Sequence, residues 1–274
     1  MKSSSLIFFS CFVLAAGSAI AQPAKPKETV IGGVAGFQDT PMQPDGKWHV
    51  HDPARPQPPV VTTGPFSENA TPPSDAIVLF DGKDLSHWTD TKGNPAPWLI
   101  QDGVMVSAKS DIQTTDKFGD MQLHLEFREP VLQGREGQDR GNSGVFLMGH
   151  YEIQVLDCYN SKTYADGTTG AIYAQHPPQA NACRPPGEWQ TYDILFTAPR
   201  FDANGKLLSP AYATVILNGV VVQNHQTIRG DTNWRTPGSY TPVGATGPIS
   251  LQYHNNSVSF RNIWVRPIQV VNEP

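Results

Sequence analysis

From Ala76 to the C-terminus the chain is a succession of short strand-like segments, and this pattern restricts the fold more than any other feature. Apolar and polar side chains alternate within the segments, as in Gln122–Phe127. Turn signals separate them, for example Asp102-Gly103, Asn204-Gly205 and Asn218-Gly219. No long stretch has an apolar period of 3.6 residues. The expected strands are 76–80, 98–100, 122–127, 145–148, 151–156, 188–196, 212–217, 249–254 and 258–265.

Such a series of strands predicts an all-β domain over residues 76–274, built as a sandwich of two curved antiparallel sheets. A region of about two hundred residues is larger than an immunoglobulin-like sandwich needs. The net charge is −5 and the chain has no basic run, so nothing in the sequence favours nucleic acid or an anionic membrane as a partner. The oligomeric state is not readable from the sequence.

The first 21 residues have the pattern of a signal peptide. Lys2 precedes the apolar run Leu6–Ala16, and Ala19-Ile20-Ala21 supplies small residues for cleavage before Gln22. The apolar run is too short to span a bilayer. We therefore expect export to the periplasm or the medium, with no membrane insertion after cleavage.

Residues 22–75 differ in composition from the rest of the chain. They are rich in proline, including Pro56, Pro58 and Pro59, and show no sustained alternation. This segment cannot build a core of its own, so it is either a disordered linker or an extended arm laid on the domain. Trp48 favours the arm locally, because so large an apolar side chain is seldom left in water.

Two cysteines remain after signal cleavage, Cys158 and Cys183. In an oxidising compartment they are candidates for a single disulfide. The alternative is two free thiols, because spacing alone does not show whether the two side chains meet.

The stretch Gly141–Asp157 is the most informative for function. Tyr151, Ile153 and Val155 alternate with Glu152 and Gln154, which predicts a strand with one apolar face and one face that carries an acid and an amide. A carboxylate beside a carboxamide suits the hydroxyls of a sugar. The alternative is the solvent face of an ordinary antiparallel sheet.

Other polar residues also interrupt apolar strands. If the strands are neighbours, these side chains converge on the concave face of a curved sheet, where amides, acids, His and Arg suit a carbohydrate ligand. With Glu152 and Gln154 included, the polar residues that interrupt apolar strands are Glu126, Arg128, Glu152, Gln154, Asp157, Glu188, Gln252, His254 and Arg261.

Four motifs in this order resemble the 3-keto-disaccharide hydrolase family. They are AIVLFDGKDLSHW at 76–88, the stretch at 141–157, GEWQTYDI at 187–194 and GPISLQYHNNSVSFRNIWVRPI at 247–268. The segment KWHVHDPARPQPPVV at 47–61 is similar to an N-terminal extension of some members. The resemblance implies a concanavalin A-like jelly roll and cleavage of glycosides whose sugar carries a ketone at C3. Many members have Arg where this chain has Met148.

The ketone dictates the chemistry that we expect. It acidifies the hydrogen on C2, so that a base removes this proton, the C1 substituent leaves by elimination and water adds back. We assign Glu152 as the base, His254 as the acid or proton shuttle, and Arg261 as the group that stabilises the enediolate oxygen. Residues for orienting hydroxyls are Glu126, Arg128, Asn142, Gln154, Asp157 and Gln252. A divalent cation bound by Glu126, Glu152, Asp157 and His254 is a further possibility.

Each assignment has an alternative. Glu152 and Arg261 are also compatible with a cross-strand ion pair, and His254-Asn255-Asn256 with a polar turn. Glu126 and Glu152 are also compatible with a conventional two-carboxylate glycosidase. A non-catalytic, lectin-like glycan-binding module is the alternative for the whole domain, because a fold does not imply a function.

Overall fold

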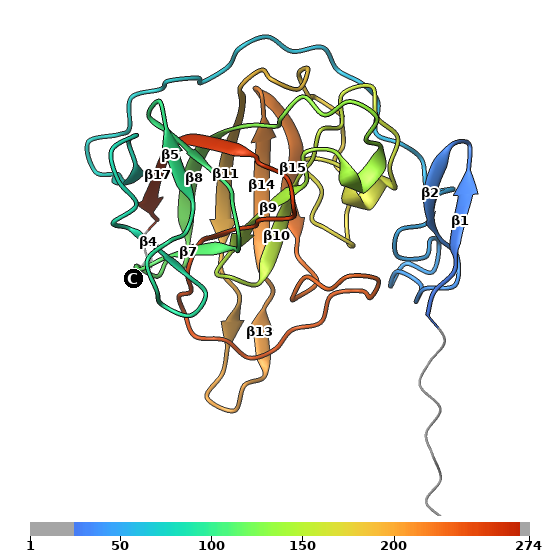
Figure 1. Cartoon of the computed structure of the whole chain (residues 1–274). Helices are drawn as coiled ribbons and strands as arrows, with labels where there is room; N and C mark the ends of the chain where they lie inside the picture. Colours follow the sequence, from blue (N-terminus) through green and yellow to red (C-terminus); the bar gives the residue numbers. More distant parts are fainter. Residues whose placement is uncertain (1–24, 269–274) are drawn as a thin grey trace, which may run out of the picture.

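The computed structural model describes residues 25–268, which form a sandwich of two antiparallel sheets (Figure 1). The predicted signal peptide lies outside the described residues. The smaller sheet has the order β10-β9-β16-β7-β4. Its strands are β10 (Tyr151–Val155), β9 (Ser143–Leu147), β16 (Ser250–Leu251), β7 (Ile112–Thr114) and β4 (Trp88–Asp90).

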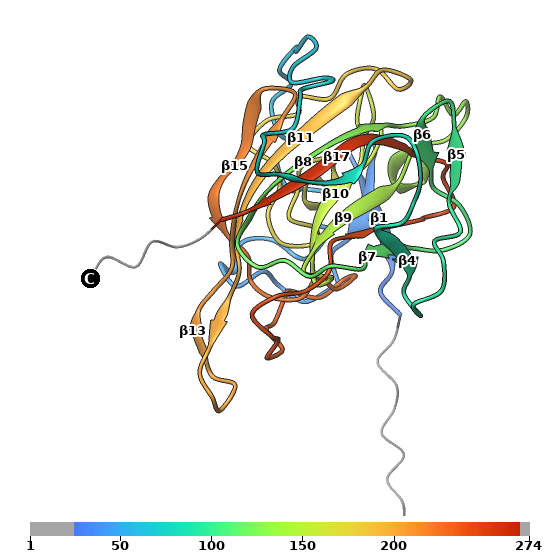
Figure 2. The same ribbon diagram turned by 90° about the vertical axis from the view of Figure 1, so that its left-hand side faces the viewer.

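The larger sheet has the order β15-β14-β11-β8-β17-β6-β5, and β3 also pairs with β17. Its strands are β15 (Val220–Thr227), β14 (Tyr212–Leu217), β11 (Gln190–Thr197), β8 (Met121–Arg128), β17 (Ser259–Pro267), β6 (Val104–Val106), β5 (Leu99–Gln101) and β3 (Ile77–Phe80). A separate hairpin, β12 (Arg200–Phe201) with β13 (Leu207–Ser209), extends from one end of the sandwich (Figures 1 and 2).

Helix is almost absent from residues 25–268. The helical pieces there are two 3₁₀ turns, η1 (Gly137–Asp139) and η2 (Ala165–Gly167). None of the described segments forms an apolar helix long enough to span a membrane. The all-β, jelly-roll expectation is therefore confirmed.

The core lies between the two sheets and follows the predicted alternation. In β8, Leu123 and Leu125 are fully buried and belong to the same core cluster as Tyr151 and Ile153 of β10. Because successive side chains of a strand point to opposite faces, Glu152, which stands between Tyr151 and Ile153, points away from the core to the outer face of the smaller sheet. Because loops cover that face as well, all five residues of β10 are buried.

The turns are those that the sequence predicted. Asn218 and Gly219, between β14 and β15, have φ angles of 50° and 84°, the left-handed region that Asn and Gly tolerate best. Strand β15 itself was not expected, because its second half, Gln223–Thr227, is polar throughout. The expected strand at 249–254 is shorter than predicted, because only Ser250–Leu251 pair with neighbouring strands.

Residues 25–75 form an extended arm packed along the sandwich. It begins with a hairpin of β1 (Glu28–Ile31) and β2 (Val34–Phe37), and the chain then passes over the sandwich to its opposite side (Figure 1). Backbone hydrogen bonds hold it, such as Val61 N–H to the Asn181 carbonyl at 2.8 Å. Only some of its large apolar groups pack against the domain: Val34, Phe37 and Val50 are buried, whereas Val60 and Phe66 are exposed.

A long loop between β10 and β11 covers the outward face of the smaller sheet. The structure joins Cys158 and Cys183 in a disulfide with their Cα atoms 6.1 Å apart, which closes most of this loop. The loop carries η2 and two tyrosines, Tyr164 and Tyr173, that reach the site described next.

Candidate active site

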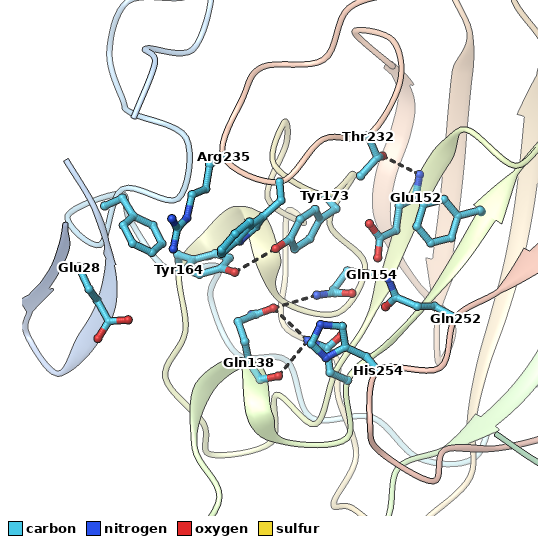
Figure 3. Close-up of a pocket in the computed structure, with 14 residues that line it drawn as sticks. Glu28, Gln138, Glu152, Gln154, Tyr164, Tyr173, Thr232, Arg235, Gln252 and His254 are labelled. Atoms are coloured by element: carbon cyan, nitrogen blue, oxygen red, sulfur yellow. Dashed lines mark hydrogen bonds between the residues drawn. The ribbon is translucent and has the colours of Figure 1, made fainter. Parts of the chain in front are cut away.

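A cleft of about 690 Å³ lies on the outward face of the smaller sheet. This volume is typical of a small-molecule site. Five residues that the sequence singled out line it together: Asn142, Glu152, Gln154, Gln252 and His254. Figure 3 shows Glu152, Gln154, Gln252 and His254 gathered at one end of the cleft.

Glu152 is the central acidic group of this end. Its side chain lies over Gly144 of the neighbouring strand, where a β-carbon would collide with the carboxyl group. The residue is 4% exposed, and its backbone N–H donates to Thr232 Oγ1 at 2.9 Å. Burial, aided by the negative charge of Asp111, raises the pKa of the Glu152 carboxyl to about 8. No hydrogen bond from residues 25–268 to its carboxyl oxygens offsets this effect.

Side-chain amides form the polar floor beside Glu152. Gln138 Oε1 accepts from Gln154 Nε2 at 3.2 Å and from Asn142 Nδ2 at 3.3 Å, while its own amide nitrogen donates to Gly167 O at 2.9 Å. These bonds fix the orientation of the amides before any ligand binds. Gln252 follows β16, held by its backbone N–H to Gly144 O at 3.0 Å, and His254 is exposed at the edge of the cleft.

Two tyrosines of the covering loop complete the middle of the cleft. Their hydroxyl groups, on Tyr164 and Tyr173, lie 3.0 Å apart. The ring of His51, from the arm, stacks on Tyr164 with a centroid distance of 4.0 Å. His51 Nδ1 is in turn 3.1 Å from Asp166 Oδ1, and both residues are fully buried. Tyr164 and Tyr173 thus form a tyrosine wall of the cleft, and the arm supports this wall through His51.

Three residues expected in the site lie on the larger sheet instead: Glu126, Arg128 and Arg261. The alternation that buries Leu123 and Leu125 in the core turns Glu126 and Arg128 to the outer face of the larger sheet. Arg261 lies opposite Glu126 on β17, and its Nε is 2.6 Å from Glu126 Oε2. Arg261 therefore forms a cross-strand ion pair, as the alternative assignment predicted, but its partner is Glu126 and not Glu152.

The charge state of Glu126 fits a structural role. Burial alone would raise the pKa of its carboxyl group, but the neighbouring His124, Asn262 and Arg261 lower it to about 2. The guanidinium of Arg261 also lies 4.0 Å above the Trp189 ring. This network binds the arm, through Asn69, to the outer face of the larger sheet. A two-carboxylate mechanism with Glu126 and Glu152 has no support from this placement.

Asp157 is also outside the cleft. It is 2% exposed and pairs with Arg140, whose Nε donates to Oδ2 at 2.9 Å. Met148 is buried in the core and does not reach the cleft.

The four residues proposed for a divalent cation do not form one donor set, because Glu126 and Asp157 are each paired with an arginine. Among residues 25–268 no three His, Cys, Asp or Glu side chains are grouped to hold a metal ion.

The sequence did not single out the residues that close the cleft. Thr232, Trp234 and Arg235 come from the loop after β15, and Glu28 and Phe37 come from the arm. Trp234, an isolated aromatic residue in a polar loop, was the one available signal. The arm residues carry no motif, and only the fold brings them to the cleft.

Comparisons with known proteins bear on the family and the fold of this chain. Residues 75–266 match the model of the 3-keto-alpha-glucoside-1,2-lyase-like domain. A Parabacteroides distasonis structure titled "putative glycosyl hydrolase" is 52% identical, with a TM-score of 0.71, and the match covers 78% of this chain and 93% of that one. A second structure with the same description from that organism is 26% identical, with a TM-score of 0.51, and the match covers 70% and 99% of the two chains. The comparison with curated proteins found no match.

The matched region holds most of the cleft, including Glu152, the amides and the tyrosines. The family and these neighbours support a glycan-acting, hydrolase-like function. The jelly roll, the polar cleft and the family match lead to one assignment: the chain belongs to the 3-keto-α-glucoside-1,2-lyase-like family, which is the 3-keto-disaccharide hydrolase family.

Proposed function

We propose that this protein cleaves glycosides whose sugar carries a ketone at C3. The observation that carries the proposal is Glu152, a carboxyl group buried in a sugar-sized polar cleft, with a pKa of about 8 and no hydrogen bond from the described residues. A structural carboxylate is normally paired, whereas a base must keep its oxygens available for a proton. The family match supports the same reaction class.

Glu152 takes the proton from C2. Its raised pKa makes the carboxylate a stronger base than an exposed Glu, and a ketone at C3 makes the C2 proton acidic enough to be removed. The electron pair of the C2–H bond moves into an enediolate between C2 and C3. The C1–O bond then breaks, a C1–C2 double bond forms and the C3 ketone is restored. In the last step water adds its oxygen to C1, Glu152 returns its proton to C2, and the proton released by the water restores the acid that protonated the leaving group.

Two neighbours of Glu152 act on the oxygens that gain negative charge during this reaction. Gln252 lies beside Glu152 (Figure 3) and offers N–H donors to the C3 oxygen, the role expected of Arg261, which the structure places on the other sheet. His254, at the edge of the cleft, is placed to donate a proton to the departing glycosidic oxygen.

We also propose that the protein is exported after loss of residues 1–21. The disulfide between Cys158 and Cys183 supports this location, because such bonds persist in oxidising compartments.

The first experiment measures turnover of 3-keto-trehalose and of unoxidised trehalose by the wild type and by Glu152→Gln. We expect only the keto sugar to be cleaved, and we expect a loss of kcat of about a hundredfold or more in the variant. Glu129→Gln is the matched control. Glu129 is also a buried carboxyl group with a pKa raised to about 8 by burial, yet it lies outside the cleft and accepts from Gln190 Nε2 at 2.8 Å. A parallel assay with chelator asks whether a divalent ion takes part.

Full activity in Glu152→Gln would contradict its assignment as the base. Cleavage of unoxidised trehalose would contradict the need for a ketone. If the wild type binds the keto sugar without cleaving it, the lectin-like function replaces the enzymatic one.

A further inference from the structure

The cleft has two chemically different ends. Glu152, Gln252 and His254 stand at one end, and Arg235 and Glu28 stand at the other, with Tyr164 and Tyr173 between them (Figure 3). At about 690 Å³ the cavity is larger than one hexose ring fills. The reaction proposed above occupies only the Glu152 end.

The far end is built around an aromatic stack. The Arg235 guanidinium carbon lies 3.6 Å from the centre of the Trp234 ring and 4.0 Å from the centre of the Phe37 ring. Phe37 is buried, while Trp234 is 62% exposed. Arg235 itself has a φ of 69°, a left-handed conformation that costs a non-glycine residue energy. The fold therefore holds a large aromatic face at the mouth of the cleft although water covers most of it.

The stack of Trp234, Arg235 and Phe37 depends on the arm, which supplies Phe37 and precedes the matched domain of residues 75–266. The Phe37 N–H donates to His51 O at 2.9 Å, and Lys162 Nζ donates to Gly32 O at 3.1 Å, so the hairpin is tied to the loops around the cleft. Glu28 opens β1 with an exposed carboxylate that faces the same cavity. Aromatic faces, a guanidinium and a carboxylate are the groups that bind a sugar ring, through its C–H face and its hydroxyls.

The direction in which the cavity extends from Glu152 indicates which sugar ring of the substrate binds at the Trp234 end. When C2 of the oxidised sugar lies at Glu152, the substituent on C1 has to leave that end of the cavity, and the cavity continues to Trp234. We propose that Trp234, Arg235, Phe37 and Glu28 form the subsite for the leaving-group sugar, so that disaccharides are preferred over simple alkyl glycosides. This inference rests on the proposed function, because it takes the Glu152 end as the reacting one.

The test compares two substrates that share the oxidised ring: 3-keto-trehalose and methyl 3-keto-α-glucoside. In Trp234→Ala we expect kcat/KM for 3-keto-trehalose to fall about tenfold, the size of a lost ring-stacking contact. The methyl glycoside should change by no more than about twofold, since it does not reach the stack, and this also shows that the variant is folded. Trp234→Phe should restore most of the preference. Tyr159→Ala is the control, because Tyr159 is 39% exposed and does not line the cleft.

The outcomes separate the subsite from the reaction. Equal losses on both substrates, or no loss on either, overturn the subsite while the reaction stands. If the wild type cleaves neither compound, the proposed function fails, and calorimetric binding of trehalose and methyl α-glucoside decides the subsite instead. Tighter binding of trehalose that disappears in Trp234→Ala supports it. Equal binding of the two, or binding of neither, overturns it.

Discussion

Three buried carboxyl groups show how local partners, and not burial alone, set the role of a side chain. Glu126, with a guanidinium and two other polar side chains beside it, has a pKa of about 2 and remains charged. Glu129 has only a Gln190 amide and a more distant Arg140 to oppose burial, and Glu152 has no such partner, so burial raises the pKa of each to about 8. Only Glu152 opens to the cleft, so only there does the raised pKa place a usable base against a ligand.

The pKa of Glu152 predicts how activity depends on pH. Below about pH 8 the carboxyl group is mostly protonated and cannot accept the C2 proton. We therefore expect kcat/KM to rise about tenfold per pH unit in the acidic range and to level off above the pKa. The measurement is kcat/KM from about pH 5 to about pH 10, corrected for spontaneous decay of the substrate.

Glu129→Gln should keep this pH profile, because its carboxyl group lies outside the cleft. A rate that falls as pH rises through 8 would indicate that Glu152 acts as an acid and not as the base.

The arm lies outside the matched domain of residues 75–266, yet it takes part in the cleft. Its hairpin supplies one wall of the cleft, and His51 supports the tyrosine wall. His51 has a φ of 60° and is anchored twice on Asp166, by its backbone N–H and by its ring nitrogen, each at 3.1 Å. The guanidinium of Arg55 also lies beside Asp166, with Nη1 3.6 Å from Oδ2. A small buried polar cluster around Asp166 therefore positions a long segment with little core of its own.

Replacing His51 by Ala should release the arm. The change leaves Asp166 buried with one partner fewer, at a cost on the order of 3 kcal/mol in the free energy of unfolding. Limited proteolysis should cut within residues 25–75 faster than in the wild type, and denaturant titration should show the lower stability.

His87→Ala is the control for this change, because His87 is 42% exposed and only reaches Asp116 at 4.0 Å. Unchanged proteolysis and stability in His51→Ala would show that other contacts hold the arm.

At the scale of the whole molecule, the site is assembled from segments far apart in the chain. The arm, the disulfide-closed loop, the smaller sheet and the loop after β15 each contribute a wall. The disulfide between Cys158 and Cys183 restricts the loop that carries both tyrosines, and such a restriction stabilises mainly by limiting the unfolded chain.

Export can be checked on the intact protein. We expect the mass of the protein recovered from the periplasm or medium to correspond to a chain that begins at Gln22 and is lighter by two hydrogens for the disulfide. Reduction should restore that difference and make Cys158 and Cys183 available for alkylation. A full-length chain in the cytoplasm with both thiols reactive would contradict export.

The sequence by itself determined the alternation of β8 and β10, the turns such as Asn218-Gly219, and hence the all-β class. Strand periodicity and turn chemistry are local properties, written in neighbouring residues. The same local pattern correctly placed Glu152 and Gln154 on one face. It gave no information on which of the two sheets a polar face belongs to, so Glu126 and Arg261 were grouped with Glu152 although they lie on the outer face of the other sheet. Only the tertiary structure decided that separation, and only it brought the arm and Trp234 to the cleft, because such contacts join residues that no sequence period connects.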